Sequence, residues 1–179
     1  MKRFLCLLTA ACLLPFAGCS FQKEEEPASV IDVYQALPLP DLFLNIPEGY
    51  EKTSSDMIEE YYLKDDASII ATEDPVVGCN DLHAYAINAL LEYEKVATEV
   101  SNTQDGVVQA QDTLVQTLEF DYTLGADGGL KLHCIAGYLT DGKSVYIITC
   151  KSQQDTFESH REEFMTVLSS ARIEKAPAQ

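Results

Sequence analysis

Hydrophobic and polar residues alternate in several short segments after residue 40, and this alternation predicts β-strands. Pro47 and Gly49 end the first segment, and Asp65-Asp66 supplies a turn between the next two. Three strands are therefore expected before the first helix, at residues 42–46, 57–63 and 68–72.

Two segments instead carry apolar residues at helical spacing. In the first, Asp81 is a good N-cap and the pattern continues to Ser101. Its apolar members are Leu82, Ala86, Leu90, Tyr93, Ala97 and Val100. In the second, Asp155 and Glu158 have the spacing of a capping box, and the helix is expected to end near Arg172. Both apolar stripes are expected to pack on the sheet of the same domain.

The chain is strand-like again after Gly106. Leu114, Leu118, Phe120 and Tyr122 should point one way and Thr117, Glu119 and Asp121 the other, which is typical of a strand with one buried face. Two more strands are expected at residues 130–140 and 143–151, with hairpin turns at 125–129 and 141–142. Antiparallel hairpins combined with two main helices predict an α+β fold with a central antiparallel sheet.

The beginning of the chain has the layout of an export signal, because cations precede a short apolar run at residues 4–16. That run is too short to span a bilayer. Residues 16–19 (Phe-Ala-Gly-Cys) resemble the bacterial lipobox, although that motif usually has leucine where this chain has Phe16. The resemblance implies lipid on Cys19 and removal of residues 1–18 as a signal peptide. The alternative is an ordinary secretory signal with a chance cysteine.

Residues 19–38 are expected to form an acidic tether between the lipid and one folded domain at residues 39–175. The run Glu24-Glu25-Glu26-Pro27 disfavours regular structure there. Fully extended, the tether would span at most roughly 60 Å. Since two acyl chains, such as palmitate, hold a protein stably at a bilayer, we expect a protein anchored on the extracytoplasmic face of a bacterial membrane.

The charge of the chain is strongly negative, with 12 Lys+Arg against 29 Asp+Glu and a net charge of −17. Removing the signal peptide, which has two cations and no acid, leaves −19. Such a surface repels phosphate backbones, so we expect no nucleic-acid partner. It suits a cationic or metal-bearing partner, but solubility and spacing from the membrane are the simpler explanation.

Three cysteines fall in the expected domain: Cys79, Cys134 and Cys150. An odd number cannot all pair internally. Cys134 and Cys150 lie on consecutive expected strands, which makes them the candidate disulfide. Small buried free thiols on strands are the commoner explanation of such residues.

The order of these elements, the opening DLFLNIPEGY and the closing F…FMTVLSSARI resemble the PsbP-like fold over about Pro40 to Lys175. That group includes the extrinsic photosystem II subunit, a small Ran-binding protein of nuclear transport and many bacterial lipoproteins of unknown role. The resemblance implies an αβα sandwich with a central antiparallel sheet. It carries over no catalytic residue, and it implies action mostly through protein partners.

The chain offers few residues for catalysis or metal binding. His83, His133 and His160 lack the i, i+4 spacing of a helical zinc site. His133 and Cys134 are neighbours on an expected strand, so their side chains should point to opposite faces. A cysteine enzyme would require a nucleophilic pair of Cys79 or Cys150 with a distant histidine. We assign no catalytic, cofactor-binding or metal-binding residue.

Acidic and aromatic doublets are the remaining candidates for binding. The acidic ones, at Glu59-Glu60, Asp65-Asp66, Glu73-Asp74 and Asp127, lack the regular spacing of calcium ligands. Tyr61 and Tyr62 are adjacent on an expected strand, so one of them should face outward as a contact residue.

The leading hypothesis is a non-enzymatic extracytoplasmic lipoprotein that binds a protein or a small ligand. The alternatives are a small cysteine-dependent hydrolase or redox protein, and a divalent-cation binder.

Overall fold

The computed structural model describes residues 41–55, 58–76, 78–126 and 128–174. They belong to one compact unit, residues 36–179. The predicted signal peptide, Cys19 and the tether lie outside the described residues. Within the described ranges, the helices are too short or too polar to cross a membrane.

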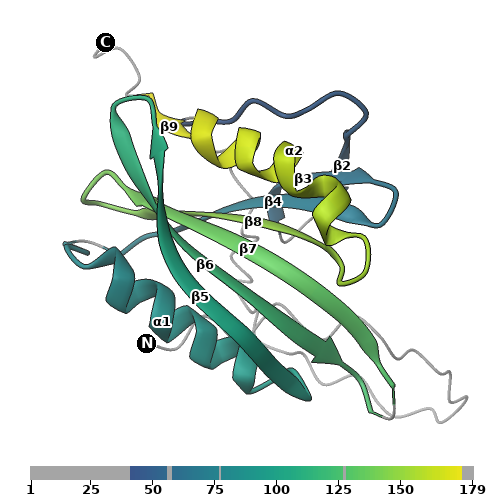
Figure 1. The fold of residues 1–179 in the computed structure, drawn as a ribbon. Coiled ribbons are helices and arrows are strands. Elements are labelled where there is room, and N and C mark those ends of the chain that lie inside the picture. Colours follow the sequence, from purple (N-terminus) through teal and green to yellow (C-terminus); the bar gives the residue numbers. More distant parts are fainter. Residues whose placement is uncertain (1–40, 56–57, 77, 127, 175–179) are drawn as a thin grey trace, which may run out of the picture. The chain divides into compact units, whose positions relative to one another are not determined.

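A seven-stranded antiparallel sheet forms the centre of the fold (Figure 1). Its strands, in spatial order, are β2 (Glu51–Ser55), β3 (Ile58–Lys64), β4 (Ala67–Asp74), β8 (Val145–Gln153), β7 (Leu130–Thr140), β6 (Thr113–Leu124) and β5 (Glu99–Ala110). The helices are α1 (Leu82–Glu94) and α2 (Phe157–Ser170). A separate two-stranded ladder joins β1 (Leu42–Phe43) to β9 (Arg172–Ile173).

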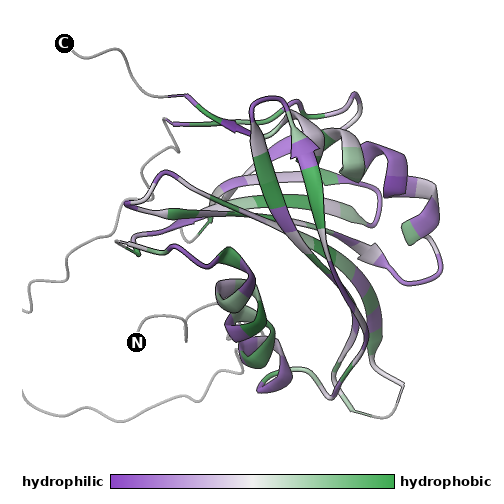
Figure 2. Cartoon of the chain, turned by 60° about the vertical axis from the view of Figure 1, so that its left-hand side comes forward, coloured by the Kyte–Doolittle hydropathy of each residue, from purple (hydrophilic) through white to green (hydrophobic). Residues whose placement is uncertain are grey.

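The two helices contribute to two different hydrophobic cores. Alternate residues of β7 divide between them, because successive side chains of a strand point to opposite faces. Ile135 belongs to the core that contains Phe164 and Leu168 of α2. Cys134 belongs to the core that contains Ala86 and Leu90 of α1. Figure 2 shows the hydrophobic residues that recur along the strands and α1.

The structure confirms the expected combination of a large antiparallel sheet with two helices. The N-cap of α1 is also as predicted, since the Asp81 carboxylate accepts a hydrogen bond from the Ala84 N–H (2.9 Å). The N-cap of α2 is Thr156 instead of Asp155. Thr156 makes no side-chain cap bond, and its hydroxyl donates to Asp66 (2.5 Å).

The predicted end of the first helix was wrong. The helix ends at Glu94, and β5 begins at Glu99 by pairing with Thr123 of β6. Ala97 and Val100 misled the prediction because both still pack against the α1 core, although neither is helical.

Two strand predictions also need correction. The first strand extends only over Leu42–Phe43, and the polar β2 was not foreseen. The strand β6 is not buried on one face alone: Val115 and Thr117 are buried beside α2, while Leu118 is buried beside α1. Leu114, which was expected to point inward, is exposed.

Candidate functional site

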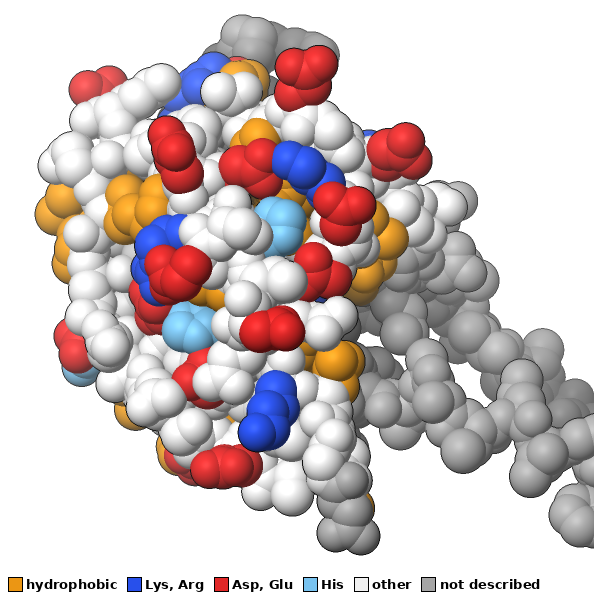
Figure 3. All heavy atoms as spheres, turned by 45° about the vertical axis from the view of Figure 1, so that its right-hand side comes forward, with side chains coloured by type: hydrophobic (Ala, Val, Ile, Leu, Met, Phe, Trp, Pro, Cys, Tyr) orange, Lys and Arg blue, Asp and Glu red, His pale blue; other side chains and the backbone are white. Residues whose placement is uncertain are grey.

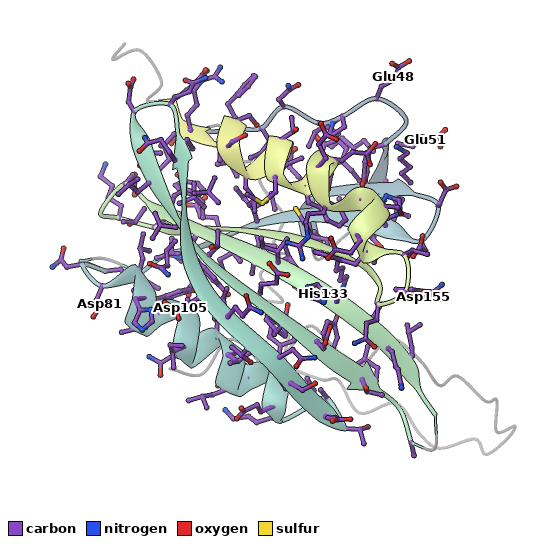
Figure 4. All side chains as sticks on the ribbon, viewed as in Figure 1. Glu48, Glu51, Asp81, Asp105, His133 and Asp155 are labelled. Atoms are coloured by element: carbon purple, nitrogen blue, oxygen red, sulfur yellow. The ribbon has the colours of Figure 1, made fainter. Side chains whose placement is uncertain are left out.

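A cluster of charged side chains lies on the α2 side of the sheet, close to the first turns of that helix. Glu119 and Asp121 project from β6, and Asp121 pairs in register with His133 on β7. Phe157 and Arg161 of α2 contact the same group. Figure 4 labels His133 on β7 near the start of α2. We call these five residues the His133 cluster.

His133 lies between two carboxylates. Its Nδ1 is 2.5 Å from Asp121 Oδ1, and its Nε2 is 2.8 Å from Glu119 Oε1. The ring also contacts Phe157 in a tilted arrangement, with 3.9 Å between the ring centroids and 43° between the ring planes. Both ring nitrogens can donate to carboxylate oxygens only when the imidazole carries two protons. The geometry therefore fits a cationic imidazolium.

The two carboxylates are held from their other sides as well. Arg161 donates two hydrogen bonds to Glu119, of 3.1 and 2.5 Å, and also pairs with Glu158. The amide of Asn102 donates to Asp121 Oδ2 (2.6 Å). Hydrogen bonds from Arg161, and then from His133, lower the pKa of Glu119 although its burial opposes this shift. Every charged group of the His133 cluster is thus compensated within the cluster.

The cluster has the wrong geometry for a metal centre. Glu119 and Asp121 approach opposite nitrogens of His133, so the three side chains cannot converge on one ion. In the described part of the chain, no group of three or more histidine, cysteine or acidic side chains is placed to hold a metal.

Two residues of the cluster, together with Ser152 on β8, supply the residue types of a hydrolase triad in one row. Asp121, His133 and Ser152 lie opposite one another on β6, β7 and β8. A triad needs the histidine Nε2 to face the serine hydroxyl. Here Nε2 faces Glu119, and the fully buried Ser152 hydroxyl donates to the Gln153 carbonyl (3.2 Å). The row is therefore not arranged to activate Ser152.

A second histidine, His160 on α2, lies between Asp66 and Glu163 at 3.5 Å from each. Lys64 donates to Glu163 (2.5 Å). Burial raises the pKa of Asp66, but hydrogen bonds from Thr156 and a backbone N–H outweigh it, so the net shift is downward. The pKa of Glu163 is lowered in the same way. Burial of Glu163 opposes this shift, but hydrogen bonds from Lys64 and His160 outweigh it. Figure 3 shows histidines set among acidic and basic side chains.

The candidate disulfide of Cys134 and Cys150 is not present. Both thiols are free and buried. Cys134 pairs in register with Lys151, whereas Cys150 pairs with Ile135, so the two sulfurs point to opposite faces of the sheet. Burial raises the pKa of the Cys134 thiol to about 12 and that of Cys150 well above its usual value. His133 and Cys134 also face opposite sides, as the sequence predicted.

The remaining cysteine and histidine candidates lie apart from the His133 cluster. Cys79 is half-buried, with its sulfur 3.9 Å from the Asp81 carbonyl. His83 is on the first turn of α1, and its Nδ1 is 3.9 Å from Asp105. Cys79 and His83 therefore belong to the α1 side of the sheet, where neither meets the histidines of α2 and β7.

The doublets serve structural contacts. Tyr62 packs at the edge of the α2 core and its hydroxyl donates to Glu60 (2.6 Å), and Tyr61 takes the other face of β3. Asp65 occupies the turn with φ 53°, and Asp74 accepts a bond from the Tyr85 hydroxyl (2.6 Å). The side chain of Glu59 and the whole of Asp127 lie outside the part of the chain that the structure describes.

Comparison with known proteins identifies the fold. No family model and no curated protein sequence matches the chain. Among solved structures, cyanobacterial PsbP (CyanoP) from Synechocystis sp. PCC 6803 matches with a TM-score of 0.57 and 13% identity, over 74% of this chain and 86% of that one. LpqN, involved in cell envelope biogenesis of Mycobacterium tuberculosis, matches with a TM-score of 0.54 and 12% identity, over 76% and 86%. At such identities the likeness concerns the fold alone.

Proposed function

Because the chain has a PsbP-like fold, we propose that it is a non-enzymatic binding protein of the bacterial cell envelope, anchored outside the cytoplasm by lipid on Cys19. The observation that carries the proposal is the combination of this fold with the sequence Phe-Ala-Gly-Cys at residues 16–19, at the end of a short apolar run. One structural neighbour, LpqN, is a protein of cell envelope biogenesis. The αβα layering expected of the fold agrees with two helices that belong to separate cores.

The side chains of the domain support binding over catalysis. The charged groups of the His133 cluster satisfy one another. The buried Cys134 and Cys150 thiols have raised pKa values, which disfavours the reactive thiolate. The partner we propose is therefore recognised through the surface of the domain.

The test of the anchor uses the full chain with its own leader. We expect the mature protein to begin at Cys19 with a diacylglyceryl group, by mass spectrometry, and to partition with membranes. Cys19→Ser should abolish the lipid, whereas Cys12→Ser, a matched change inside the leader, should leave it in place. An unmodified N-terminus in the wild type, or an intact leader in the cytosol, contradicts the proposal.

The test of binding uses the same lipidated protein in its native membrane. Chemical cross-linking before solubilisation should yield one reproducible complex, identified by mass spectrometry. The control is the same protein unfolded by urea before mixing with solubilised membranes, which should lose that complex. A folded, lipidated protein that repeatedly gives no specific complex would count against a binding role.

A further inference from the structure

The outward faces of the two helices differ in character. The exposed residues of α2 are all polar: Glu158, Ser159, Glu162, Thr166 and Ser169. The outward face of α1 instead carries Ala84, Ile87 and Leu91, with Ile87 37% and Leu91 46% exposed. A helix that packs on one sheet normally turns polar residues to water, as α2 does. The composition of α1 indicates a helix with contacts on two sides.

Ile87 and Leu91 lie on the side of α1 that faces β5, the edge strand of the sheet. The Nδ1 of His83 on α1 is 3.9 Å from the carboxylate of Asp105 on β5, so the side of α1 that carries His83 faces β5. Ile87 and Leu91 follow His83 at intervals of four residues, so the three side chains form one row along the helix. Figure 4 labels Asp81 and Asp105 near the start of α1.

Acidic residues border this row. Glu94 lies one turn beyond Leu91 on α1, Glu99 begins β5, and Asp105 lies at the other end beside His83. All three carboxylates are exposed. In the described ranges, none of the three forms an ion pair with a lysine or arginine. We call Ile87, Leu91, Glu94, Glu99 and Asp105 the α1 surface.

The charge of the α1 surface decides between its potential occupants. A second copy of the chain would bring the same carboxylates face to face, and an anionic lipid surface would be repelled in the same way. A cationic partner gains attraction at the rim and buries the apolar row at the centre. The ridge formed by residues four apart fits into the groove of another helix.

We propose that the α1 surface binds an amphipathic helix of a partner protein, whose apolar side chains cover Ile87 and Leu91 and whose lysines or arginines meet Glu94, Glu99 and Asp105. This proposal rests on the binding role proposed above and names the surface and the chemistry of its partner. In other helix-in-groove contacts, apolar side chains at positions i and i+4 of the bound helix anchor it in the groove.

The experiment measures binding of a defined probe to the full lipidated protein in a neutral detergent. The probe is a fluorescent 18-residue helical peptide with leucines on one face and lysines on the other, and its counterpart has glutamates in place of the lysines. We expect the lysine peptide to bind with a dissociation constant in the micromolar range. The glutamate peptide should bind at least tenfold more weakly.

Matched variants then separate the α1 surface from the general acidity of the chain. Leu91→Ser should weaken lysine-peptide binding about tenfold, whereas Leu130→Ser, an equally exposed leucine on the β6–β7 hairpin, should change it less than twofold. Glu94→Lys should weaken it about tenfold, whereas Glu162→Lys, the same charge change on the outward face of α2, should change it less than threefold. Circular dichroism establishes that each variant is folded.

Two results of the peptide experiment would overturn the proposal. One is equal weakening by Glu94→Lys and Glu162→Lys, which would assign the peptide to non-specific attraction. The other is no binding of the lysine peptide. If the cross-linked membrane complex persists in Leu91→Ser, the binding role stands and the α1 surface is wrong. If the wild type itself gives no complex, the binding role fails.

Discussion

The Nδ1 of His133 and the Oδ1 of Asp121 are 2.5 Å apart across two neighbouring strands, and Asp121 is only 7% exposed. A nearly buried carboxylate is costly unless it is paired. The Asn102 amide and the His133 ring together supply that pairing. His133 therefore compensates a charge that the sheet has already buried.

Replacing His133 with leucine should destabilise the protein strongly. His133→Leu removes the imidazole ring and leaves Asp121 and Glu119 with one partner fewer each, so the free energy of unfolding should fall by about 2–4 kcal/mol. Urea denaturation measures the change. His83→Leu, which removes a solvent-exposed histidine, is the control and should change it by less than about 0.5 kcal/mol. Equal effects of the two substitutions would show that the His133 cluster stabilises nothing.

Acid should weaken the attachment of α2 to the sheet. The pKa values of Glu119, Asp66 and Glu163 are lowered in the folded state. A lowered carboxyl pKa contributes stability above the unfolded value of about 4, and that contribution is lost as the pH falls through the folded value. The free energy of unfolding should therefore decline below about pH 5.

The matched variant for the acid effect is Glu119→Gln, which cannot titrate at that position. It should be less stable than the wild type at pH 7 and lose less further stability between pH 5 and pH 3. Chemical denaturation at a series of pH values measures both. Parallel pH profiles for the two proteins would contradict the assignment to Glu119.

The sequence predicted those parts of the fold that depend on local pattern. The hairpin at Asp141-Gly142 was found because its residue types suit a tight turn, and Asp141 indeed accepts two backbone N–H bonds there. The end of α1 was missed because Ala97, in the turn after the helix, and Val100, on β5, pack against the same core as residues of α1 do. Apolar spacing alone does not separate those two cases.

The His133 cluster depends on strand register, which the local pattern does not carry. Glu119 and Asp121 were expected to face away from the apolar side of β6, as they do, but their burial depends on α2 covering that face. A shift in register between Ser101 and Gln104 accompanies the contact of Asn102 with Asp121. Acids at i and i+2 opposite a histidine on the next strand were the one available signal.

The cysteines of the folded protein should differ in reactivity. Cys134 and Cys150 are buried and their pKa values are raised, whereas Cys79 is half-buried. A maleimide reagent at pH 7.5 should modify Cys79 within minutes and the other two only after unfolding in urea. Mass spectrometry of the labelled peptides gives the order in which the three cysteines react. Rapid labelling of Cys150 in the native protein would reopen the cysteine-enzyme hypothesis.

Gly137 on β7 tests how closely α2 approaches the sheet. A Cβ added at Gly137 would lie 2.6 Å from Leu168 Cδ2 and 2.8 Å from Val115 Cγ1, and both of these side chains are fully buried. Gly137→Ala should therefore cost about 1–3 kcal/mol through overpacking, although alanine suits a strand better than glycine does. The double variant Gly137→Ala with Leu168→Ala separates the clash with Leu168 from the other effects of the added methyl group. If the added methyl group only displaces Leu168, the double variant should be no less stable than Leu168→Ala alone, by urea denaturation. A further loss of the full 1–3 kcal/mol in the double variant would place the strain in the contact with Val115 of β6 or in the strand itself, and not in the contact with α2.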